Sequence, residues 1–443
     1  MKPTVIRIWV AGLLTLMACL LYLDRFAVGI ASEQMRVDLQ MTQTQMSWFL
    51  SAFFWSYALF QVPAGWFSDR FGPRIMLTVY ILGWSLFTGL LGVATQVWIV
   101  LLFRFLCGAT QAGAYPVCSA LIRAWFPISR RGIASSIVSM GGRSGAVLAP
   151  ILTAALMTAY AGNWRPVLLL YGGVGILVSM AYAWVCRDTP QQHPQCNAAE
   201  RMLIAATDAG PDIGASKSQK PPFPWLTVLT SLSLWGNCLT QFFTNIGWLF
   251  VVTWLPRYLG VVHGVPLTEQ AVMTAVPIGS GVLGMFCGGW WTDHATRRFG
   301  LKWGRRLPVM STRFLAAGGY GLCLVLGIFC TPDPQSRWLP WTIIAGLSFA
   351  TFCCDLGVPA IWAYTQDVGG KYTASIMGWS NMFGNFGAAV APLLYNFVLG
   401  ETPTLSQWNC LFAVCVGTFI ISGLSALVLD ASQPIMDESV DPV

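Results

Sequence analysis

The chain has 443 residues, of which 55% are hydrophobic and only 10% are charged, and its formal net charge is +7. Soluble globular domains carry about a quarter charged residues, so this composition excludes an ordinary soluble fold and indicates a membrane protein. The excess of Lys and Arg fits either a nucleic-acid partner or an uneven distribution across a bilayer. The positions of these residues decide between the two.

Apolar stretches of about 20 residues, the length that a helix needs to cross a bilayer, recur along the whole chain. They predict an all-α membrane protein with twelve transmembrane helices. The predicted spans are 7–31, 46–67, 75–95, 97–125, 132–159, 165–186, 226–256, 268–292, 308–330, 338–366, 373–399 and 405–429.

Lys and Arg residues concentrate in every second connection between these spans. Cytoplasmic connections carry such an excess in membrane proteins. The pattern therefore predicts a multi-pass protein of the cell (inner or plasma) membrane with both termini in the cytoplasm. Because topology accounts for the net charge, no nucleic-acid partner is predicted, and the lipid bilayer is the expected surrounding.

One connection, residues 187–224, is polar and rich in Pro, Gln and Ser, and it separates six spans from six. It predicts a cytoplasmic linker between an N-terminal six-helix half (1–186) and a C-terminal six-helix half with a short cytoplasmic tail (225–443). A flexible tether is the simplest interpretation, although "NAAERMLIAATD" within it has the pattern of a short surface helix.

The two predicted halves repeat each other. "SMGGRSGAVLAP" at 139–150 matches "NMFGNFGAAVAP" at 381–392, and "GWFSDR" at 65–70 is echoed by "GWWTDH" at 289–294. Duplicated halves imply a pseudo-two-fold axis along the membrane normal, with a cavity between the halves near the midplane. Small residues at helical spacing predict close helix packing. They are Gly141, Gly145, Gly384 and Gly387.

The sequence offers little support for an enzyme or a receptor. It has 13 Cys and three His residues, but they form no Ser/His/Asp, Cys/His or metal-ligand pattern. Most Cys residues sit singly within spans, where Cys behaves as a small hydrophobe. No cofactor, metal or disulfide framework is predicted, and no sizeable soluble domain exists to report the binding of a ligand.

Two arginines and one aspartate lie at membrane depth in the first half. Asp24 and Arg25 occur in "YLDRFAVGI" of the first span, and Arg104 lies in the fourth. Both arginines are about 9–10 Å from the outer ends of their spans. Intramembrane charges indicate function, and a carboxylate or phosphate ligand would suit two such guanidinium groups. Alternatively, Arg25 pairs with Asp24 while Arg104 caps a helix or reaches toward the interface.

Other polar residues are predicted to lie near the same depth. Arg143 falls near the midplane of the fifth span, and the internal repeat aligns it with Asn385, one turn after Asn381. This arrangement could hold an anion across the cavity, but bracing between helices explains each residue equally well. Tyr57 could line the cavity or simply pack.

The segment "GWFSDRFGPR" at 65–74 resembles the signature loop of the major facilitator superfamily. The matching positions are Gly65, Asp69, Arg70, Gly72 and Arg74, and the looser second copy carries Asp293. The resemblance implies that this loop joins the halves on the cytoplasmic side and opens when they rock. Asp69 at a helix end beside arginines would then form a breakable charge latch.

"YLDR" in the first span and "RFLCGATQAG" (104–113) in the fourth resemble the anion:cation symporter family, whose members transport hexuronates, galactonate, glucarate, phthalate, sialic acid and glutamate. The resemblance implies that Arg25 and Arg104 bind the substrate carboxylate and that Asp24 takes part in proton coupling. Many proton-coupled members carry Glu where this chain has Gln111, which lies on the same helix face as Arg104 and does not titrate.

These observations favour a secondary transporter that moves small organic anions, such as sugar acids or other carboxylates, together with protons and that functions as a monomer. Gln111 keeps an alternative open, namely an exchanger of organic phosphates or other anions, or an uncoupled facilitator.

Overall fold

The computed structural model describes residues 3–205, 223–332, 337–400 and 403–435, and every regular element in these ranges is helical, as predicted. The described chain forms two compact units. The first consists of the residues up to Pro224 together with Thr365–Trp379, and the second of Trp225–Tyr364 and Ser380–Ile435.

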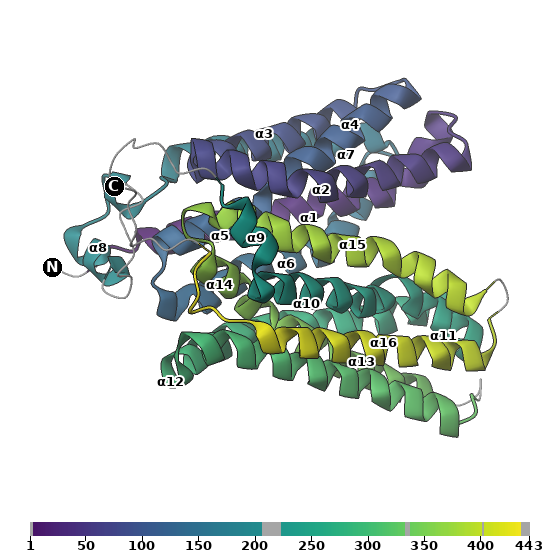
Figure 1. The fold of residues 1–443 in the computed structure, drawn as a ribbon. Helices are drawn as coiled ribbons and strands as arrows, with labels where there is room; N and C mark the ends of the chain where they lie inside the picture. Colours follow the sequence, from purple (N-terminus) through teal and green to yellow (C-terminus); the bar gives the residue numbers. More distant parts are fainter. Residues whose placement is uncertain (1–2, 206–222, 333–336, 401–402, 436–443) are drawn as a thin grey trace. The chain divides into compact units, whose positions relative to one another are not determined.

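The first unit contains long helices that lie side by side, drawn in purple to teal in Figure 1. Its elements are α1 (Ile6–Asp38), α2 (Gln43–Phe71), α3 (Pro73–Leu91), α4 (Val97–Gln111), α5 (Ala114–Trp125), η1 (Ile128–Arg130), α6 (Arg131–Ala159), α7 (Trp164–Val185), η2 (Pro190–Gln192) and α8 (Ala198–Ala205). The 3₁₀ turn η4 (Gly370–Tyr372) also belongs to it.

The second unit continues from α9 to the last described helix. Its elements are α9 (Trp225–Thr230), α10 (Leu232–Leu249), the π-helical turn η3 (Phe250–Trp254), α11 (Leu255–His263), α12 (Leu267–Phe329), α13 (Trp338–Leu356), α14 (Val358–Val368), α15 (Thr373–Leu399), α16 (Leu405–Ser425) and η5 (Ala426–Val428). The end of α14 and the first turns of α15 pack with the first unit.

Among the described residues, ten segments are long and apolar enough to cross a membrane. The second predicted span lies in α2, a 29-residue helix that is not one of the ten. The eighth and ninth predicted spans both fall within α12, which is broken at Gly300, where φ is 75° and ψ is 176°. The structure therefore shows a multi-pass helical protein, and the count of twelve spans stays a prediction.

The repeated glycines allow helices to touch backbone to backbone, as predicted. A Cβ atom on Gly141 or Gly145 of α6 would collide with the backbone of Thr15 or Cys19 in α1. In the second unit, a Cβ atom on Gly387 of α15 would collide with the backbone of Phe242 in α10. Close approach increases van der Waals contact between the helices. In a bilayer this contact drives helix association, because the hydrophobic effect does not favour helix–helix over helix–lipid contact.

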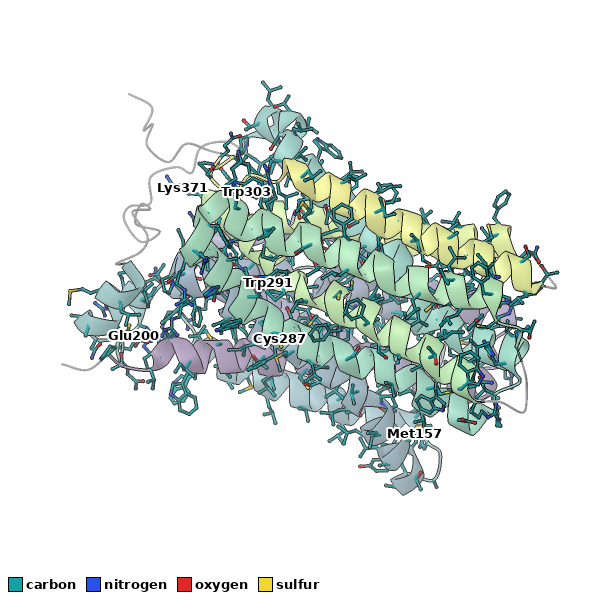
Figure 2. The ribbon with its side chains drawn as sticks, turned by 90° about the horizontal axis from the view of Figure 1, so that it is seen from below. Met157, Glu200, Cys287, Trp291, Trp303 and Lys371 are labelled. Atoms are coloured by element: carbon teal, nitrogen blue, oxygen red, sulfur yellow. The ribbon has the colours of Figure 1, made fainter. Side chains whose placement is uncertain are left out.

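The first part of the predicted linker is packed against the helices rather than free. Glu200 of α8 is fully buried, and Figure 2 shows it beside the start of α1. Its carboxylate accepts hydrogen bonds from the Thr4 hydroxyl, from the backbone N–H of Ile6 at 3.3 Å and from that of Arg7 at 3.2 Å. The first N–H groups of a helix lack intrahelical partners, so Glu200 caps α1 from a distant segment.

A second linker carboxylate caps α3 in the same way. The backbone N–H of Arg74 donates to Asp188 at 2.6 Å, and the Arg74 guanidinium donates to the Ala183 carbonyl at 2.6 Å. Neither α1 nor α3 has a side-chain cap of its own. The predicted short helix in the linker is confirmed as α8, but free flexibility is wrong for residues 187–205. The remainder of the linker, 206–222, lies outside the described residues.

Candidate functional site

The charged residues predicted in the first and fourth spans meet inside the first unit. Asp24 and Arg104 are 1% and 2% exposed, and Gln111 is fully buried two helix turns after Arg104. Arg25 Nη2 donates to Gln111 Oε1 at 3.4 Å, which joins α1 to α4. This bond reaches α4 two turns after Arg104, so the equal depth that the sequence predicts for Arg25 and Arg104 stays a prediction.

Several polar atoms of this cluster have no hydrogen-bond partner among the described residues. They are Nε of Arg25, Nε and Nη1 of Arg104, and Nε2 of Gln111. Buried polar groups in folded proteins are nearly always hydrogen-bonded, because a lost partner costs about 1–3 kcal/mol or more for a charged group. A concentration of such groups at one place is typical of a site built for a ligand.

Asp24 and Arg25 form no ion pair, although they are neighbours in the sequence. Adjacent side chains on a helix point in directions about 100° apart, and here Arg25 turns toward Gln111 while Asp24 interacts electrostatically with Arg104. The alternative in which the two neighbours simply neutralise each other is therefore wrong. The cluster contains two guanidinium groups and one carboxyl group.

Aromatic rings surround both guanidinium groups. The Cζ atom of Arg25 lies 4.5 Å from the ring centre of Tyr57, 5.0 Å from that of Phe53 and 5.1 Å from that of Tyr22. The Cζ atom of Arg104 lies 4.4 Å from the ring centre of Phe53. The sequence did not decide whether Tyr57 lines the cavity or simply packs. In the structure its ring contacts the charged cluster directly. Phe53 was not predicted.

The remaining predicted site residues are divided between the units. Arg143 follows Gly142 in α6, and a Cβ atom on Gly142 would collide with the hydroxyl of Tyr115 and the ring of Tyr22. Asn381 and Asn385 lie in the part of α15 that belongs to the second unit, where Asn385 Nδ2 donates to the Asn381 carbonyl at 2.8 Å. The predicted pairing of Arg143 with Asn385 across the halves stays a prediction.

The signature loop contacts the start of α15. Asp69 accepts hydrogen bonds from the backbone N–H groups of Ala374 at 3.3 Å and Ser375 at 2.8 Å, and from the Ser375 hydroxyl at 2.5 Å. A Cβ atom on Gly65 would lie 2.5 Å from the Ala374 carbonyl oxygen, so glycine permits this approach. A carboxylate at a helix N-terminus gains both hydrogen bonds and a favourable dipole interaction.

The other latch residues have separate surroundings. Arg74 is held by Asp188 and Ala183 as described above, and Arg70 packs over the rings of Trp66 and Phe71. In the second copy of the motif, Asp293 of α12 is fully buried. Their contribution to a latch between halves stays a prediction.

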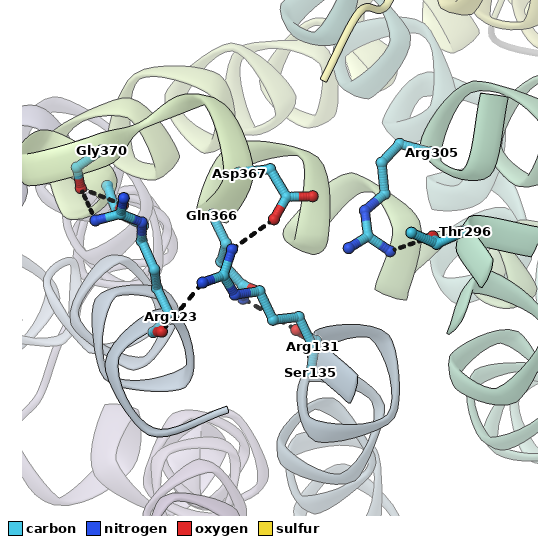
Figure 3. Close-up of polar contacts among 9 residues, drawn as sticks. Arg123, Arg131, Ser135, Thr296, Arg305, Gln366, Asp367 and Gly370 are labelled. Atoms are coloured by element: carbon cyan, nitrogen blue, oxygen red, sulfur yellow. Dashed lines mark hydrogen bonds and ion pairs between the residues drawn. The ribbon is translucent and has the colours of Figure 1, made fainter. Parts of the chain in front are cut away.

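Sequence reasoning missed a second set of contacts beside Asp69. The Arg131 guanidinium forms an ion pair with Asp367 at 2.7 Å, with both side chains at most 4% exposed. Gln366 Nε2 donates to the Ser135 hydroxyl at 3.0 Å, and Arg123 Nη1 donates to the Gly370 carbonyl at 2.7 Å (Figure 3). No local motif marks Asp367, because its partner lies 236 positions away.

A multi-pass helical protein with a buried cluster of charges has the features of a membrane transporter. The chain belongs to the Major Facilitator Superfamily, whose family model matches residues 14–392. The predicted resemblance is thereby confirmed, and the chain is a transporter rather than an enzyme.

Several curated relatives are named as probable transporters of organic acids. A protein of Escherichia coli named "Probable galactarate/D-glucarate transporter GudP" is 30% identical over 443 residues, covering 96% of this chain and 92% of the relative. A protein of Cupriavidus necator named "Probable sulfoacetate transporter SauU" is 28% identical over 396 residues, covering 89% of this chain and 88% of the relative.

A solved structure supports the fold. The crystal structure of the Escherichia coli fucose:proton symporter FucP matches with a TM-score of 0.69 at 13% sequence identity, covering 95% of this chain and 99% of that one. At this identity the match establishes the shared helical fold and says nothing about the substrate.

Proposed function

We propose that this protein is a secondary active transporter that moves small organic anions, such as sugar acids or other carboxylates, together with protons. The observation that carries the proposal is the buried cluster of Asp24, Arg25, Arg104 and Gln111, in which charged N–H groups lack partners among the described residues. The organic-acid transporters among the relatives support it.

The proposed architecture is the twelve-helix form of the superfamily. Two six-helix halves, 1–186 and 225–443, are related by a pseudo-two-fold axis and joined by the linker 187–224. Both termini face the cytoplasm, the protein lies in the cell membrane, and a single chain is the functional unit. Rocking of the halves about a central site then exposes the substrate to each side in turn.

In this scheme the two arginines hold the anionic group of the substrate. A guanidinium group presents parallel N–H donors that match a carboxylate, and such charge-assisted bonds are about twice as strong as neutral ones. Gln111 and Tyr57 add neutral polar contacts beside Arg25. Arg143, Asn381 and Asn385 are proposed to bind the remainder of the substrate from the facing helices.

Asp24 is the proposed proton carrier. Asp24 is 1% exposed, and burial disfavours a charged carboxylate in such surroundings. A protonated Asp24 leaves the two arginines free to attract an anion, so proton and substrate binding support each other. Release of the proton inside restores the negative charge beside Arg104, which weakens the hold on the substrate.

The latch completes the cycle. Gly65, Asp69, Arg70, Arg74 and Asp293 are proposed to stabilise the conformation in which the cytoplasmic ends of the halves are joined. The bonds from Asp69 to the start of α15 would break when the cytoplasmic side opens.

Substrate binding is tested by measuring melting temperatures of the purified protein with sugar acids, aromatic acids, organic phosphates and matched neutral sugars. A ligand at about 100 times its dissociation constant adds roughly 2.7 kcal/mol to the stability of the folded state. We expect carboxylates to raise the melting temperature of the wild type and to have no effect on Arg104→Ala. A response to neutral sugars that survives in Arg104→Ala would refute the anion site.

Coupling is tested separately with Asp24→Asn in proteoliposomes. We expect this variant to retain exchange of substrate across the membrane but to lose accumulation against a gradient. Accumulation that persists would move the proton site elsewhere. Gln111 favours a second candidate, an anion exchanger or uncoupled facilitator, which predicts that even the wild type fails to respond to a proton gradient.

A further inference from the structure

Phe53 of α2 is fully buried and is the ring that both arginines share. The Cζ atom of Arg104 lies 4.4 Å from its centre and that of Arg25 lies 5.0 Å away. We infer that Phe53 is a positioning residue for the anion site, holding the two guanidinium groups in place while no anion is bound. This inference rests on the proposed function, because it assigns the ring a task within that site.

The surrounding helices fix the ring in position. Gly108 of α4 lies one turn after Arg104, and a Cβ atom there would collide with the Phe53 carbonyl and the Ser56 hydroxyl. The Ser56 hydroxyl donates to the same carbonyl at 3.0 Å. The absence of a side chain at Gly108 therefore lets α2 and α4 approach closely enough for the Phe53 ring to reach Arg104.

The neighbouring turn of α2 extends the aromatic surface toward Arg25. The rings of Phe53 and Tyr57 stack with centres 5.8 Å apart and an interplanar angle of 15°. Arg25 contacts both rings, while Arg104 contacts Phe53 and, at 5.7 Å, Phe49. Aromatic rings on three successive turns of α2 therefore contact two guanidinium groups, one from α1 and one from α4.

The physical reason for such an arrangement is the repulsion between two like charges at a buried site. The face of an aromatic ring is electronegative, so a cation above it is attracted even without a counter-ion, and the attraction grows when water is excluded. Phe53 therefore stabilises both arginines in the anion-free protein. It leaves their N–H groups available, which a carboxylate in the same place would occupy.

Anion binding then competes with this role. Once a carboxylate neutralises the guanidinium groups, the ring gains less from them, so Phe53 favours the anion-free state over the bound one. A ring with a less electronegative face should consequently lower the stability of the protein without ligand and increase its affinity for the anion. A residue that only fills space would not change these two properties in opposite directions.

The test replaces Phe53 by mono-, di- and trifluorinated phenylalanine, which keep the shape of the ring while weakening its negative face. Melting temperatures are measured without ligand and with D-glucarate, galactarate and sulfoacetate. We expect the ligand-free melting temperature to fall with each added fluorine. For an anion that binds the wild type, the dissociation constant should fall by about tenfold across the series.

The same fluorinated residues at Phe54 serve as the matched control. Phe54 touches the edge of the Phe53 ring, is 57% exposed and takes part in no cation–π contact within the described residues. A ligand-free melting temperature that does not depend on fluorination at position 53, or an affinity that falls with it, would overturn the inference. If no anion binds the wild type, the proposed function fails, and the ligand-free series still decides the role of Phe53.

Discussion

Replacing Glu200 by Gln should loosen the start of α1. The change preserves the size of the side chain and one acceptor oxygen, but removes the negative charge that faces the N–H groups of Ile6 and Arg7. The hydroxyl of Thr4 loses a charged acceptor as well. Because α1 has no side-chain cap of its own, nothing nearby replaces the lost interaction.

The size of the effect follows from three bonds to one buried carboxylate. A charge at a partly buried helix N-terminus contributes up to about 2 kcal/mol, and hydrogen bonds to charged groups contribute about 1.5–3 kcal/mol against about 1 kcal/mol for neutral ones. Since Gln keeps one acceptor, we expect a loss of about 2 kcal/mol. For a unit of about 150–250 residues, the range that includes the first unit, this corresponds to a fall in melting temperature of about 4–8 °C.

The assay is thermal unfolding of the purified full chain, combined with amide hydrogen exchange at residues 5–10. The exchange measurement distinguishes local opening of α1 from a general loss of stability. Met202→Gln, at a residue of α8 that is 65% exposed, controls for introducing Gln into the same helix. A Glu200→Gln variant that melts with the wild type and exchanges no faster would refute the capping argument.

Three further predictions concern other contacts. Asp367→Asn leaves Arg131 buried without its ionic partner and should cost about 3 kcal/mol, measured as a lower melting temperature. Gly145→Val forces α6 away from α1 and should cost about 1–3 kcal/mol, with a lower yield of folded protein. Burial alone raises the pKa of Asp430, but the hydrogen bonds from Lys302 and Ser432 and the charge of Lys302 together outweigh it, and the pKa lies below its usual value. Asp430 therefore stabilises the fold above the usual aspartate pKa, and the difference in melting temperature between wild type and Asp430→Asn should vanish as the pH falls through the lowered value.

Controls for these predictions lie elsewhere in the same chain. Asp38→Asn breaks the exposed ion pair with Arg165 and should change stability by less than about 1 kcal/mol. Gly173→Val adds a side chain where no atom lies within 4 Å, so it should be tolerated. If Asp38→Asn cost as much stability as Asp367→Asn, or Gly173→Val as much as Gly145→Val, burial would not explain the predicted losses. An effect of Asp430→Asn that does not depend on pH would contradict the ionic role of Asp430.

The helical fold, the close helix contacts and the charged cluster could all be predicted from the sequence. The length of the apolar stretches indicates the membrane helices, and the internal repeat indicates the glycines at which these helices touch. Both patterns can be read directly from the sequence. Arg25 and Arg104 were identifiable because a charge in an apolar stretch is conspicuous. Arg25 and Gln111, which both lie in the quoted segments, are joined by a hydrogen bond.

Phe53 could not be found in this way. One Phe among many in an apolar span carries no signal, and its task depends on how α1, α2 and α4 pack. Gly108, one turn from Arg104, was the available hint of a close approach at that level. The packing of the first part of the linker could not be predicted either. Glu200 and Asp188 lie in a polar segment, where a charged side chain is expected to face water.

The cap on α1 also has a consequence for biogenesis. Ile6 and Glu200 are separated by 194 positions, so the first helix leaves the ribosome long before its cap exists. At about 5–20 residues per second, the delay is about 10–40 s. During that interval the N–H groups at the start of α1 lack the cap that α8 provides. Docking of α8 therefore marks the moment at which helices α1 to α7 have all been made.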